Sequence, residues 1–191
     1  METKPLFSTI NAGKYKGKKI LLPSLESTRS TKAILKGSFF DSVHYDIVDE
    51  LFVEVFGGSG SMGLEALSRG AKHAYFIEKD KAAFSTLKRN CESIDKTHTT
   101  ALHGDSFLLF PTLVAHFTCK AYFYFDPPFS IREGMESVYE KVLSLIASIP
   151  QEKVHLIAIE HMSTLVLPEV IGAFTLQKTK KFGKSSLSYY A

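Results

Sequence analysis

Several features that define specialised classes of protein are missing from this chain of 191 residues. No apolar run approaches the roughly 18 residues that a membrane-spanning helix requires, and the first ten residues do not resemble a secretory signal. The two cysteines, Cys91 and Cys119, lie far apart and form no CxxC pattern, which indicates free thiols in a reducing compartment. We therefore expect a soluble protein of the cytoplasm.

Metal-binding patterns are missing as well. The seven histidines form no HxxxH or His/Cys ligand spacing, so we expect no metal in the protein or in its chemistry. There is no internal repeat, and a content of 45% hydrophobic and 23% charged residues is that of an ordinary globular protein. The length fits one domain with a small appendage.

Charge is distributed unevenly along the chain. Residues 1–36 hold eight basic and two acidic residues, whereas the remainder holds 15 basic and 18 acidic residues. A basic arm on a mildly acidic body is expected when one segment grips a phosphate backbone. A basic tail that is merely solvated is the alternative. The candidate phosphate-binding residues are Lys14, Lys16, Lys18, Lys19 and Arg29.

The order of the apolar patterns predicts an α/β protein. Two short strands, residues 7–10 and 15–22, flank a turn near the N-terminus, and a helix is expected over residues 33–43. Beyond residue 46, strands expected over 51–56, 74–78, 101–103, 121–125 and 154–160 alternate with helices expected over 60–69, 81–93, 106–116 and 133–149. This alternation favours a parallel sheet that is covered by helices on both faces.

The last stretch of the chain breaks the alternation. Residues 173–178 and 185–190 are strand-like and are joined by a short basic turn, so they predict a hairpin at the sheet edge. A mostly parallel seven-stranded sheet with such an antiparallel edge hairpin is typical of Rossmann-like class I methyltransferases, which use S-adenosylmethionine (SAM). We therefore expect an N-terminal extension over residues 1–45 and a methyltransferase domain over residues 46–191.

A glycine-rich segment marks a candidate cofactor site. Residues 58–63, GSGSMG, fit the pattern GxGxxG between an expected strand and an expected helix. The glycines allow a tight turn and a close approach of the backbone to a ligand at the helix N-terminus. Glu78 ends the next strand, 20 residues after Gly58, where a carboxylate can accept both hydroxyls of a ribose. A turn that only packs strand against helix is the alternative.

A carboxylate in the preceding strand discriminates between cofactors. Glu54 would repel a pyrophosphate but would suit an ammonium group, and SAM carries an amino-acid end and no phosphate. Farther along, Asp105 either reads the amine of the cofactor's adenine or only caps the next helix. The residues expected to hold the cofactor are Glu54, Phe56, Gly58, Ser59, Gly60, Gly63, Glu78, Lys79, Gly104, Asp105, Ser106 and Asp126.

The motif Asp-Pro-Pro-Phe at residues 126–129 follows the apolar strand expected over 121–125. Because proline fixes its own φ and keeps the preceding residue extended, the Asp126 carboxylate and the Pro127 carbonyl should both point outward. Two acceptors beside the flat ring of Phe129 can hold a planar amine with two N–H donors, such as the exocyclic amine of a nucleobase. The expected catalytic residues are Asp126, Pro127, Pro128 and Phe129; a surface Asp in an ordinary turn is the alternative.

Together these motifs resemble the RsmD-type 16S rRNA guanine-N2 methyltransferases. The resemblance runs through AGKYKGKKI (12–20), TRST (28–31), FVEVFGGSGSMGLEALSRGA (52–71), IEKD (77–80), DPPF and the final hairpin. It implies a SAM-dependent enzyme whose basic extension contacts 16S rRNA in the small ribosomal subunit or its assembly intermediate. The sequence does not determine the oligomeric state, and a monomer is the default expectation.

Two alternatives to this function stay open. A DPP-aromatic motif serves any exocyclic amine, so an adenine-N6 methyltransferase acting on DNA or RNA has the same local chemistry. A non-catalytic RNA-binding protein on a methyltransferase-like scaffold is the second alternative. Two departures from the family pattern, Ser30 where proline is usual and Gly37 where an acidic residue is expected, both lie around the N-terminal helix.

Overall fold

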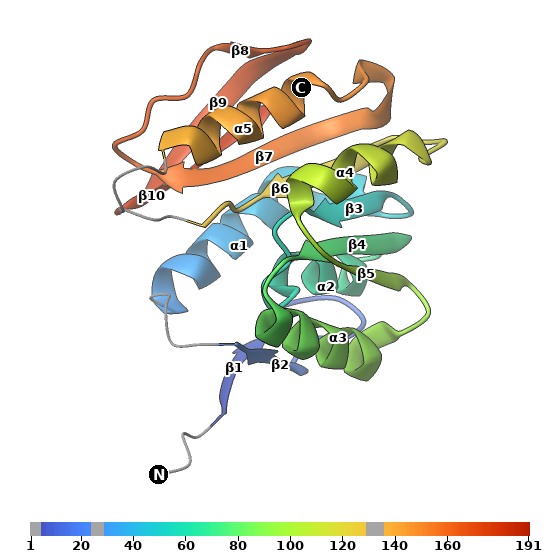
Figure 1. Cartoon of the computed structure of the whole chain (residues 1–191). Coiled ribbons are helices and arrows are strands. Elements are labelled where there is room, and N and C mark those ends of the chain that lie inside the picture. The colour runs from blue at the N-terminus through green and yellow to red at the C-terminus, as the bar shows by residue number, and fades with distance from the viewer. Residues whose placement is uncertain (1–4, 24–28, 129–135) are drawn as a thin grey trace.

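The structure of the protein is a computed structural model that describes residues 5–23, 29–128 and 136–191 (Figure 1). Its helices are α1 (Arg29–Val43), α2 (Ser61–Ser68), α3 (Lys81–Asp95), α4 (Ser106–Ala115) and α5 (Glu136–Ala147), with single 3-10 turns at His44–Ile47 and Gln151–Lys153. Its strands are β1 (Leu6–Thr9), β2 (Lys19–Leu22), β3 (Leu51–Glu54), β4 (His73–Glu78), β5 (Thr99–His103), β6 (Ala121–Phe125), β7 (Val154–Met162), β8 (Val170–Ile171), β9 (Phe174–Phe182) and β10 (Ser185–Tyr190). Within these described ranges, no helix is long and apolar enough to span a bilayer.

The central sheet has the strand order β5-β4-β3-β6-β7-β10-β9-β8. The five strands from β5 to β7 pair in parallel, and β10, β9 and β8 continue the sheet antiparallel. The predicted Rossmann-like fold with its antiparallel edge hairpin is confirmed. The sheet has eight strands rather than the expected seven, because the two-residue β8 is too short to produce an alternating sequence pattern.

Helices cover both faces of the sheet, α1, α2 and α3 on one and α4 and α5 on the other (Figure 1). The alternation of side chains along β6 explains why its sequence is continuously apolar. Tyr122 and Tyr124 lie in the core under α1 to α3, whereas Phe123 and Phe125 lie in the core under α4 and α5. On the second face, the ring of Phe110 from α4 lies 5.6 Å from the rings of both Phe123 and Phe125.

Helix α1 begins at Arg29, four residues earlier than expected, and packs directly on the sheet. Its side chains Leu35, Phe39 and Phe40 are buried, and the Phe39 ring lies 5.4 Å from that of Tyr124. This packing fixes α1 above the carboxyl end of β6. Residues of α1 that precede Leu35 therefore reach the edge of the sheet where parallel strands end.

The N-terminal strands form a separate antiparallel pair, with Leu6 opposite Leu22 and Thr9 opposite Lys19. Strand β2 is shorter than the expected 15–22 because the preceding residues form a turn against α2. Gly13 has φ of +81°, and a Cβ there would lie 1.6 Å from the Ser68 carbonyl oxygen. Only glycine allows the turn to approach α2 this closely.

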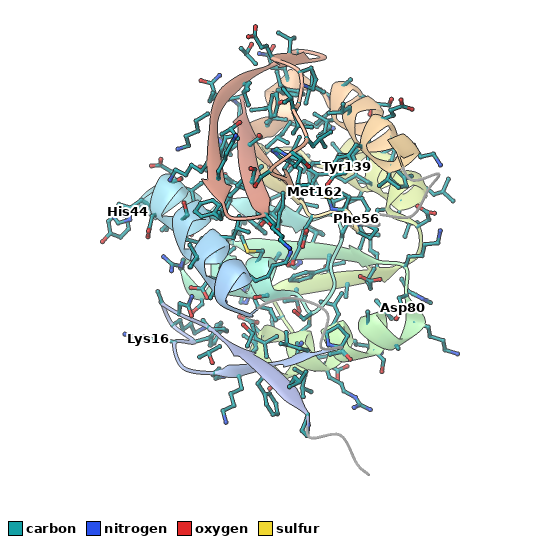
Figure 2. All side chains as sticks on the ribbon, turned by 90° about the vertical axis from the view of Figure 1, so that its left-hand side faces the viewer. Lys16, His44, Phe56, Asp80, Tyr139 and Met162 are labelled. Atoms are coloured by element: carbon teal, nitrogen blue, oxygen red, sulfur yellow. The ribbon has the colours of Figure 1, made fainter. Side chains whose placement is uncertain are left out.

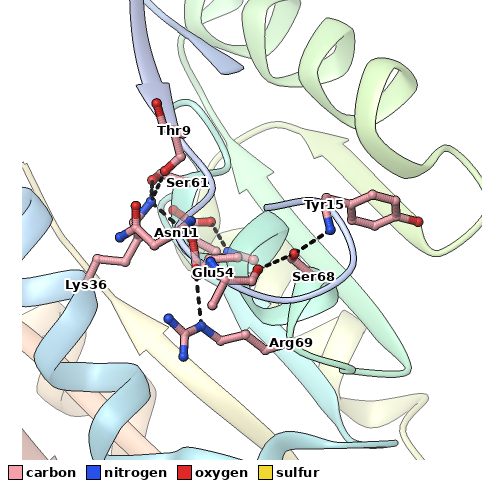
Figure 3. Close-up of polar contacts among 11 residues, drawn as sticks. Thr9, Asn11, Tyr15, Lys36, Glu54, Ser61, Ser68 and Arg69 are labelled. Atoms are coloured by element: carbon pink, nitrogen blue, oxygen red, sulfur yellow. Dashed lines mark hydrogen bonds and ion pairs between the residues drawn. The ribbon is translucent and has the colours of Figure 1, made fainter. Parts of the chain in front are cut away.

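A buried carboxylate of α2 fastens this turn to the body of the protein. Figure 3 shows this region and labels Asn11, Lys36 and Arg69, three partners of that carboxylate. The fully buried Glu65 of α2 accepts hydrogen bonds from the backbone N–H groups of Asn11 (2.8 Å) and Ala12 (3.1 Å). The same carboxylate forms ion pairs with Arg69 (2.9 Å) and with Lys36 of α1 (3.4 Å). The hairpin, α1 and α2 are thus held together by one polar network beneath the surface.

Candidate active site

A cavity of about 650 Å³ lies at the carboxyl ends of β3 and β6. This is the place where the strand order reverses around β3, and open α/β sheets bind ligands in the crevice at such a reversal. The volume is within the range of roughly 300–1,000 Å³ that is common for small-molecule sites. Its lining comes from β1, α1, the glycine loop and the ends of β6 and β7. Of the predicted residues, Glu54, Phe56, Gly58, Ser59, Asp126, Pro127 and Pro128 line it.

The glycine loop presents its backbone to this cavity. Gly58 has φ of +50°, and a Cβ on it would meet nothing within 4 Å, so the loop leaves open space at this point. The Gly58 N–H donates a hydrogen bond of 2.8 Å to the Glu78 carboxylate at the end of β4. A ligand held by Glu78 would therefore also lie against the glycine loop.

The other two glycines of the motif serve packing. A Cβ on Gly60 would lie 2.7 Å from the side chain of Leu87, and one on Gly63 would lie 2.4 Å from the ring of Phe76. Both distances are too short for real contacts, so Gly60 lets the start of α2 pack closely on α3 and Gly63 lets it pack closely on the sheet. In this motif, Gly58 leaves space for a ligand, whereas Gly60 and Gly63 allow close packing.

Glu54 ends β3 at the floor of the cavity, and only 6% of its surface is exposed. Its carboxylate accepts a hydrogen bond of 2.9 Å from the N–H of Gly63 in the first turn of α2. Burial raises the pKa of Glu54 to about 8, against the lowering effect of the backbone hydrogen bonds. A cation that enters the cavity would stabilise the ionised form of this carboxyl group, because burial otherwise disfavours the charge.

Asp126 lies directly beside a second carboxylate, Glu160 of β7. Phe125 pairs in register with Ile159, so the next residues of the two chains are neighbours. The ammonium group of Lys32, from the second turn of α1, lies 2.5 Å from Asp126 Oδ2 and 2.8 Å from Glu160 Oε1. Because burial alone would lower the pKa of Lys32 and the two carboxylates raise it above its usual value, the ammonium form is favoured.

Glu160 is held in place by a buried tyrosine of the neighbouring strand. The hydroxyl of the buried Tyr124 donates a hydrogen bond of 3.0 Å to Glu160 Oε2, and only 1% of the Glu160 side chain is exposed. Burial, followed by the charge of Asp126, raises the pKa of Glu160 to about 7 despite the Lys32 ammonium. The pair is therefore a rigid acidic site rather than a solvated surface cluster.

A spare donor lies near this acidic pair. The Tyr139 hydroxyl of α5 is buried and has no hydrogen-bond partner among the described residues. Burial, with the charges of Asp126 and Glu160, raises the pKa of this hydroxyl. A buried hydroxyl without a partner is uncommon in folded proteins, and Tyr139 lies outside the lining of the cavity.

The residues expected at the adenosine end lie beside the cavity rather than in its lining. Asp105 caps α4 by accepting a hydrogen bond of 3.0 Å from the Phe107 N–H, and its contact with the adenine amine stays a prediction. Its other oxygen accepts a hydrogen bond of 2.8 Å from Lys79 Nζ, and this hydrogen bond lowers the pKa of Asp105. The Ser106 hydroxyl is buried and donates to the Val55 carbonyl, and the Gly104 N–H donates to the Glu78 carbonyl.

The proline motif is described up to Pro128. Pro127 is buried and Pro128 is exposed, and both line the cavity next to Asp126. Phe129, the expected stacking residue, lies outside the described residues, and so does the side chain of Arg29. Their predicted roles stay predictions.

The four expected lysines of the N-terminal hairpin are exposed. Lys14 and Lys18 lie 5.0 and 4.9 Å from the ring centre of Tyr15, and Lys19 lies 5.5 Å from that of Phe7. Figure 2 shows Lys16 at the margin of the molecule, on the turn of the hairpin. Phe7, Ser8 and Leu22 of the same hairpin line the cavity, so the element that carries these lysines also forms part of the wall of the candidate site.

A second cavity, of about 660 Å³, lies at the opposite edge of the sheet. It is lined by residues at the amino ends of β3 and β4, among them Leu51 and His73, and it contains Lys14 alone of the predicted residues. Neither the glycine loop nor the Asp-Pro-Pro motif reaches it. The candidate active site is therefore the cavity at the carboxyl edge.

Sequence analysis missed Lys32, Tyr124 and Glu160 as members of the site. Glu160 had a usable signal, because an acidic residue near the end of a strand next to β6 must lie close to Asp126. Tyr124 was recognised only as a core residue. Lys32 had no local signal, since its place depends on how α1 packs across the sheet.

The strand order, the glycine loop and the carboxylates at the carboxyl edge define a Rossmann-like methyltransferase fold. The chain belongs to the family described as Conserved hypothetical protein 95, whose model matches residues 8–191. The resemblance drawn from the sequence motifs is confirmed.

Relatives with similar sequences cover almost the whole chain. The chain is 29% identical over 188 residues to "Ribosomal RNA small subunit methyltransferase D" of Haemophilus influenzae, covering 95% of this chain and 92% of that protein. It is 28% identical over 184 residues to the protein of the same name from Escherichia coli, covering 95% and 88%. The solved structure of "Putative methyltransferase yhhF from Escherichia coli" matches 97% of both chains at 26% identity, with a TM-score of 0.76.

Proposed function

We propose that this protein transfers a methyl group from SAM to the exocyclic N2 amine of a guanine in the 16S rRNA of the small ribosomal subunit. The broader assignment, SAM-dependent methylation of ribosomal RNA, agrees with the family and with the names of its relatives. The choice of guanine N2 is the finer step. The Asp126 carboxylate accepts the Lys32 ammonium at the edge of the cavity next to Pro127, and this supports transfer to an exocyclic amine. The choice of guanine over adenine rests on the resemblance to the RsmD-type family.

The residues present fit the cofactor. Gly58 leaves open space beside Glu78, as a loop that lies against a ribose requires. Glu54 offers a buried carboxyl group to the ammonium of an amino-acid end. When bound, SAM supplies an electrophilic methyl group on a positively charged sulfur. Asp105 and Lys79 would border the adenine end.

Asp126 and Pro127 would hold and activate the target amine. The lone pair of a nucleobase amine is delocalised into the ring, so the nitrogen is a poor nucleophile. Hydrogen bonds from its two N–H groups to the Asp126 carboxylate and the Pro127 carbonyl would localise that lone pair and stabilise the charge that develops on nitrogen. The Asp126 carboxylate can then accept the proton that the amine loses. Phe129 would stack on the base.

The N-terminal extension, residues 1–45, would bind the RNA around the target base. Lys14, Lys16, Lys18 and Lys19 are exposed on a hairpin whose strands also line the cavity. Phosphates bound along this hairpin would lead an extruded base into the active site. Arg29 would extend the same surface. We propose that the protein acts in this way as a monomer in the cytoplasm, where small subunits are assembled.

Methylation of small subunits tests the proposal. Subunits that lack the modification are incubated with SAM labelled in the methyl group, and the RNA is digested to nucleosides and analysed by mass spectrometry. N2-methylguanosine is the expected product, and naked 16S rRNA serves as the comparison substrate. N6-methyladenosine would favour the adenine-N6 alternative. If calorimetry detects no binding of SAM and no methylated nucleoside forms, the non-catalytic scaffold is favoured.

A further inference from the structure

The Lys32 ammonium marks a subsite for N–H donors that contains two carboxylates, Asp126 and Glu160. It bridges Asp126 Oδ2 and Glu160 Oε1 at 2.5 and 2.8 Å, and all three side chains line the cavity. A group that replaces this ammonium meets two carboxylate acceptors side by side. A single exocyclic amine needs only Asp126 and the adjacent carbonyl, so Glu160 is an acceptor that the proposed function does not yet use.

The two carboxylates are built to stay together. They follow residues paired in register on neighbouring parallel strands, Phe125 and Ile159. Glu160 is almost fully buried, and the Tyr124 hydroxyl fixes its second oxygen at 3.0 Å. Glu160 Oε1 therefore faces the cavity side of the pair. Its direction is set by the protein and not by the ligand.

The edge of the target base determines what such a pair can recognise. On guanine, the N2 amine lies next to N1–H, so two neighbouring positions are donors. On adenine, the N6 amine lies next to an unprotonated N1, which is an acceptor. A carboxylate beside N1 attracts guanine and repels the N1 lone pair of adenine.

We propose that Glu160 is the specificity-determining residue of the site, accepting the N1–H of guanine while Asp126 accepts an N–H of the N2 amine. This inference rests on the proposed function, because it concerns the same base in the same cavity. It supplies the discrimination between guanine and adenine that the Asp-Pro-Pro motif lacks.

Lys32 has a defined part in this arrangement. In the free protein its ammonium occupies the space between the two carboxylates. The base displaces it from Asp126, and it keeps its ion pair with Glu160, whose oxygen has two lone pairs and can accept from both donors. The retained ammonium favours the ionised form of Glu160, in which the carboxylate is only an acceptor.

The test compares guanine with a base that keeps the N2 amine but lacks N1–H. Small subunits are reconstituted with RNA that carries either guanine or 2-aminopurine at the target position. 2-Aminopurine keeps the N2 amine but has no N1–H and no oxygen at C6. We expect the wild-type protein to methylate guanine with kcat/KM about 10- to 100-fold above that for 2-aminopurine, the discrimination typical of a specific hydrogen-bonded base contact.

Glu160→Gln provides the second comparison, because its side-chain amide can donate to an unprotonated N1. We expect the variant to lose about 10- to 100-fold in kcat/KM on guanine and to narrow the preference for guanine over 2-aminopurine to a few-fold. Affinity for SAM by calorimetry should stay unchanged. Glu140→Gln, a matched change at an exposed position of α5, should leave both rates as in the wild type.

The outcomes separate the two proposals. Equal rates of the wild-type protein on the two bases would overturn the role of Glu160, whatever the variant does. An unchanged preference in Glu160→Gln would overturn it as well. If the wild-type protein modifies a base other than guanine, or none, the proposed function itself fails.

Discussion

The Glu65 carboxylate of α2 accepts a 2.8 Å hydrogen bond from the backbone N–H of Asn11, and this contact ties the N-terminal hairpin to the methyltransferase sheet. Because it involves the backbone of the hairpin, this hydrogen bond does not depend on the side chain of Asn11. Glu65 also neutralises the buried Lys36, which donates to the Thr9 carbonyl at 2.9 Å. Glu65 therefore contributes to the position of the basic hairpin, together with Ser68 and Asn90.

Glu65→Ala should destabilise the protein strongly. The change leaves the Lys36 ammonium buried without its nearest counter-charge and frees two backbone N–H groups. We expect a loss of about 3–5 kcal/mol in the free energy of unfolding, typical of breaking a buried ion pair by removing one partner. Urea denaturation measures it, with the exposed Glu152→Ala as the control. A loss no larger than that of the control would show that the hairpin is attached by other contacts.

Replacing Lys16, Lys18 and Lys19 together with alanine should weaken RNA binding without unfolding the protein, because all three side chains are exposed. Each lost phosphate contact should flatten the dependence of log affinity on log salt by about 0.7–0.9. Binding to 16S rRNA is measured across a salt series. The matched control replaces Lys72, Lys88 and Lys120, which lie outside the hairpin. A salt slope equal to that of the wild type would support the interpretation of the hairpin as a merely solvated basic tail.

Cofactor binding should depend on pH through Glu54. Burial raises the pKa of Glu54 to about 8, so the carboxyl group of the free protein is largely protonated at pH 6 to 7. A bound ammonium favours the ionised form and lowers this pKa, so binding releases a proton. Affinity for SAM should therefore rise between pH 6 and 7.5.

Calorimetry in two buffers of different ionisation enthalpy measures the proton release directly. Glu54→Gln should bind more weakly and should lose this pH dependence, which separates Glu54 from Glu160, whose pKa lies near 7. Equal affinity of the wild-type protein at pH 6 and 7.5, without proton release, would exclude Glu54 as the partner of the ammonium.

The sequence determined the architecture well because its signals were local. Apolar runs separated by helical periodicities located all five parallel strands, and the predicted strand over 121–125 has the observed bounds of β6. The expected strand over 51–56 ends at Glu54 instead, since the next residues turn into the glycine loop. The start of α1 was placed too late because polar residues at a helix N-terminus carry no periodic apolar signal.

The site was predictable only in part. The Gly58 contact with Glu78 follows from a motif with fixed spacing, and the cavity does contain Glu54 and Asp126. Two features depend on long-range packing and left no trace in the local sequence. Lys32 reaches Asp126 across 94 positions of the chain, and Glu65 reads as one polar residue in an apolar helix although it is fully buried.

The central claim is that Asp126 holds the amine that receives the methyl group. Methyl transfer to small subunits is measured for the wild type, for Asp126→Ala and for Asp41→Ala, an exposed position on α1, together with SAM affinity for each. The account predicts that Asp126→Ala abolishes transfer while SAM affinity stays within a few-fold of the wild-type value and Asp41→Ala behaves as the wild type. Undiminished methylation by Asp126→Ala would contradict it.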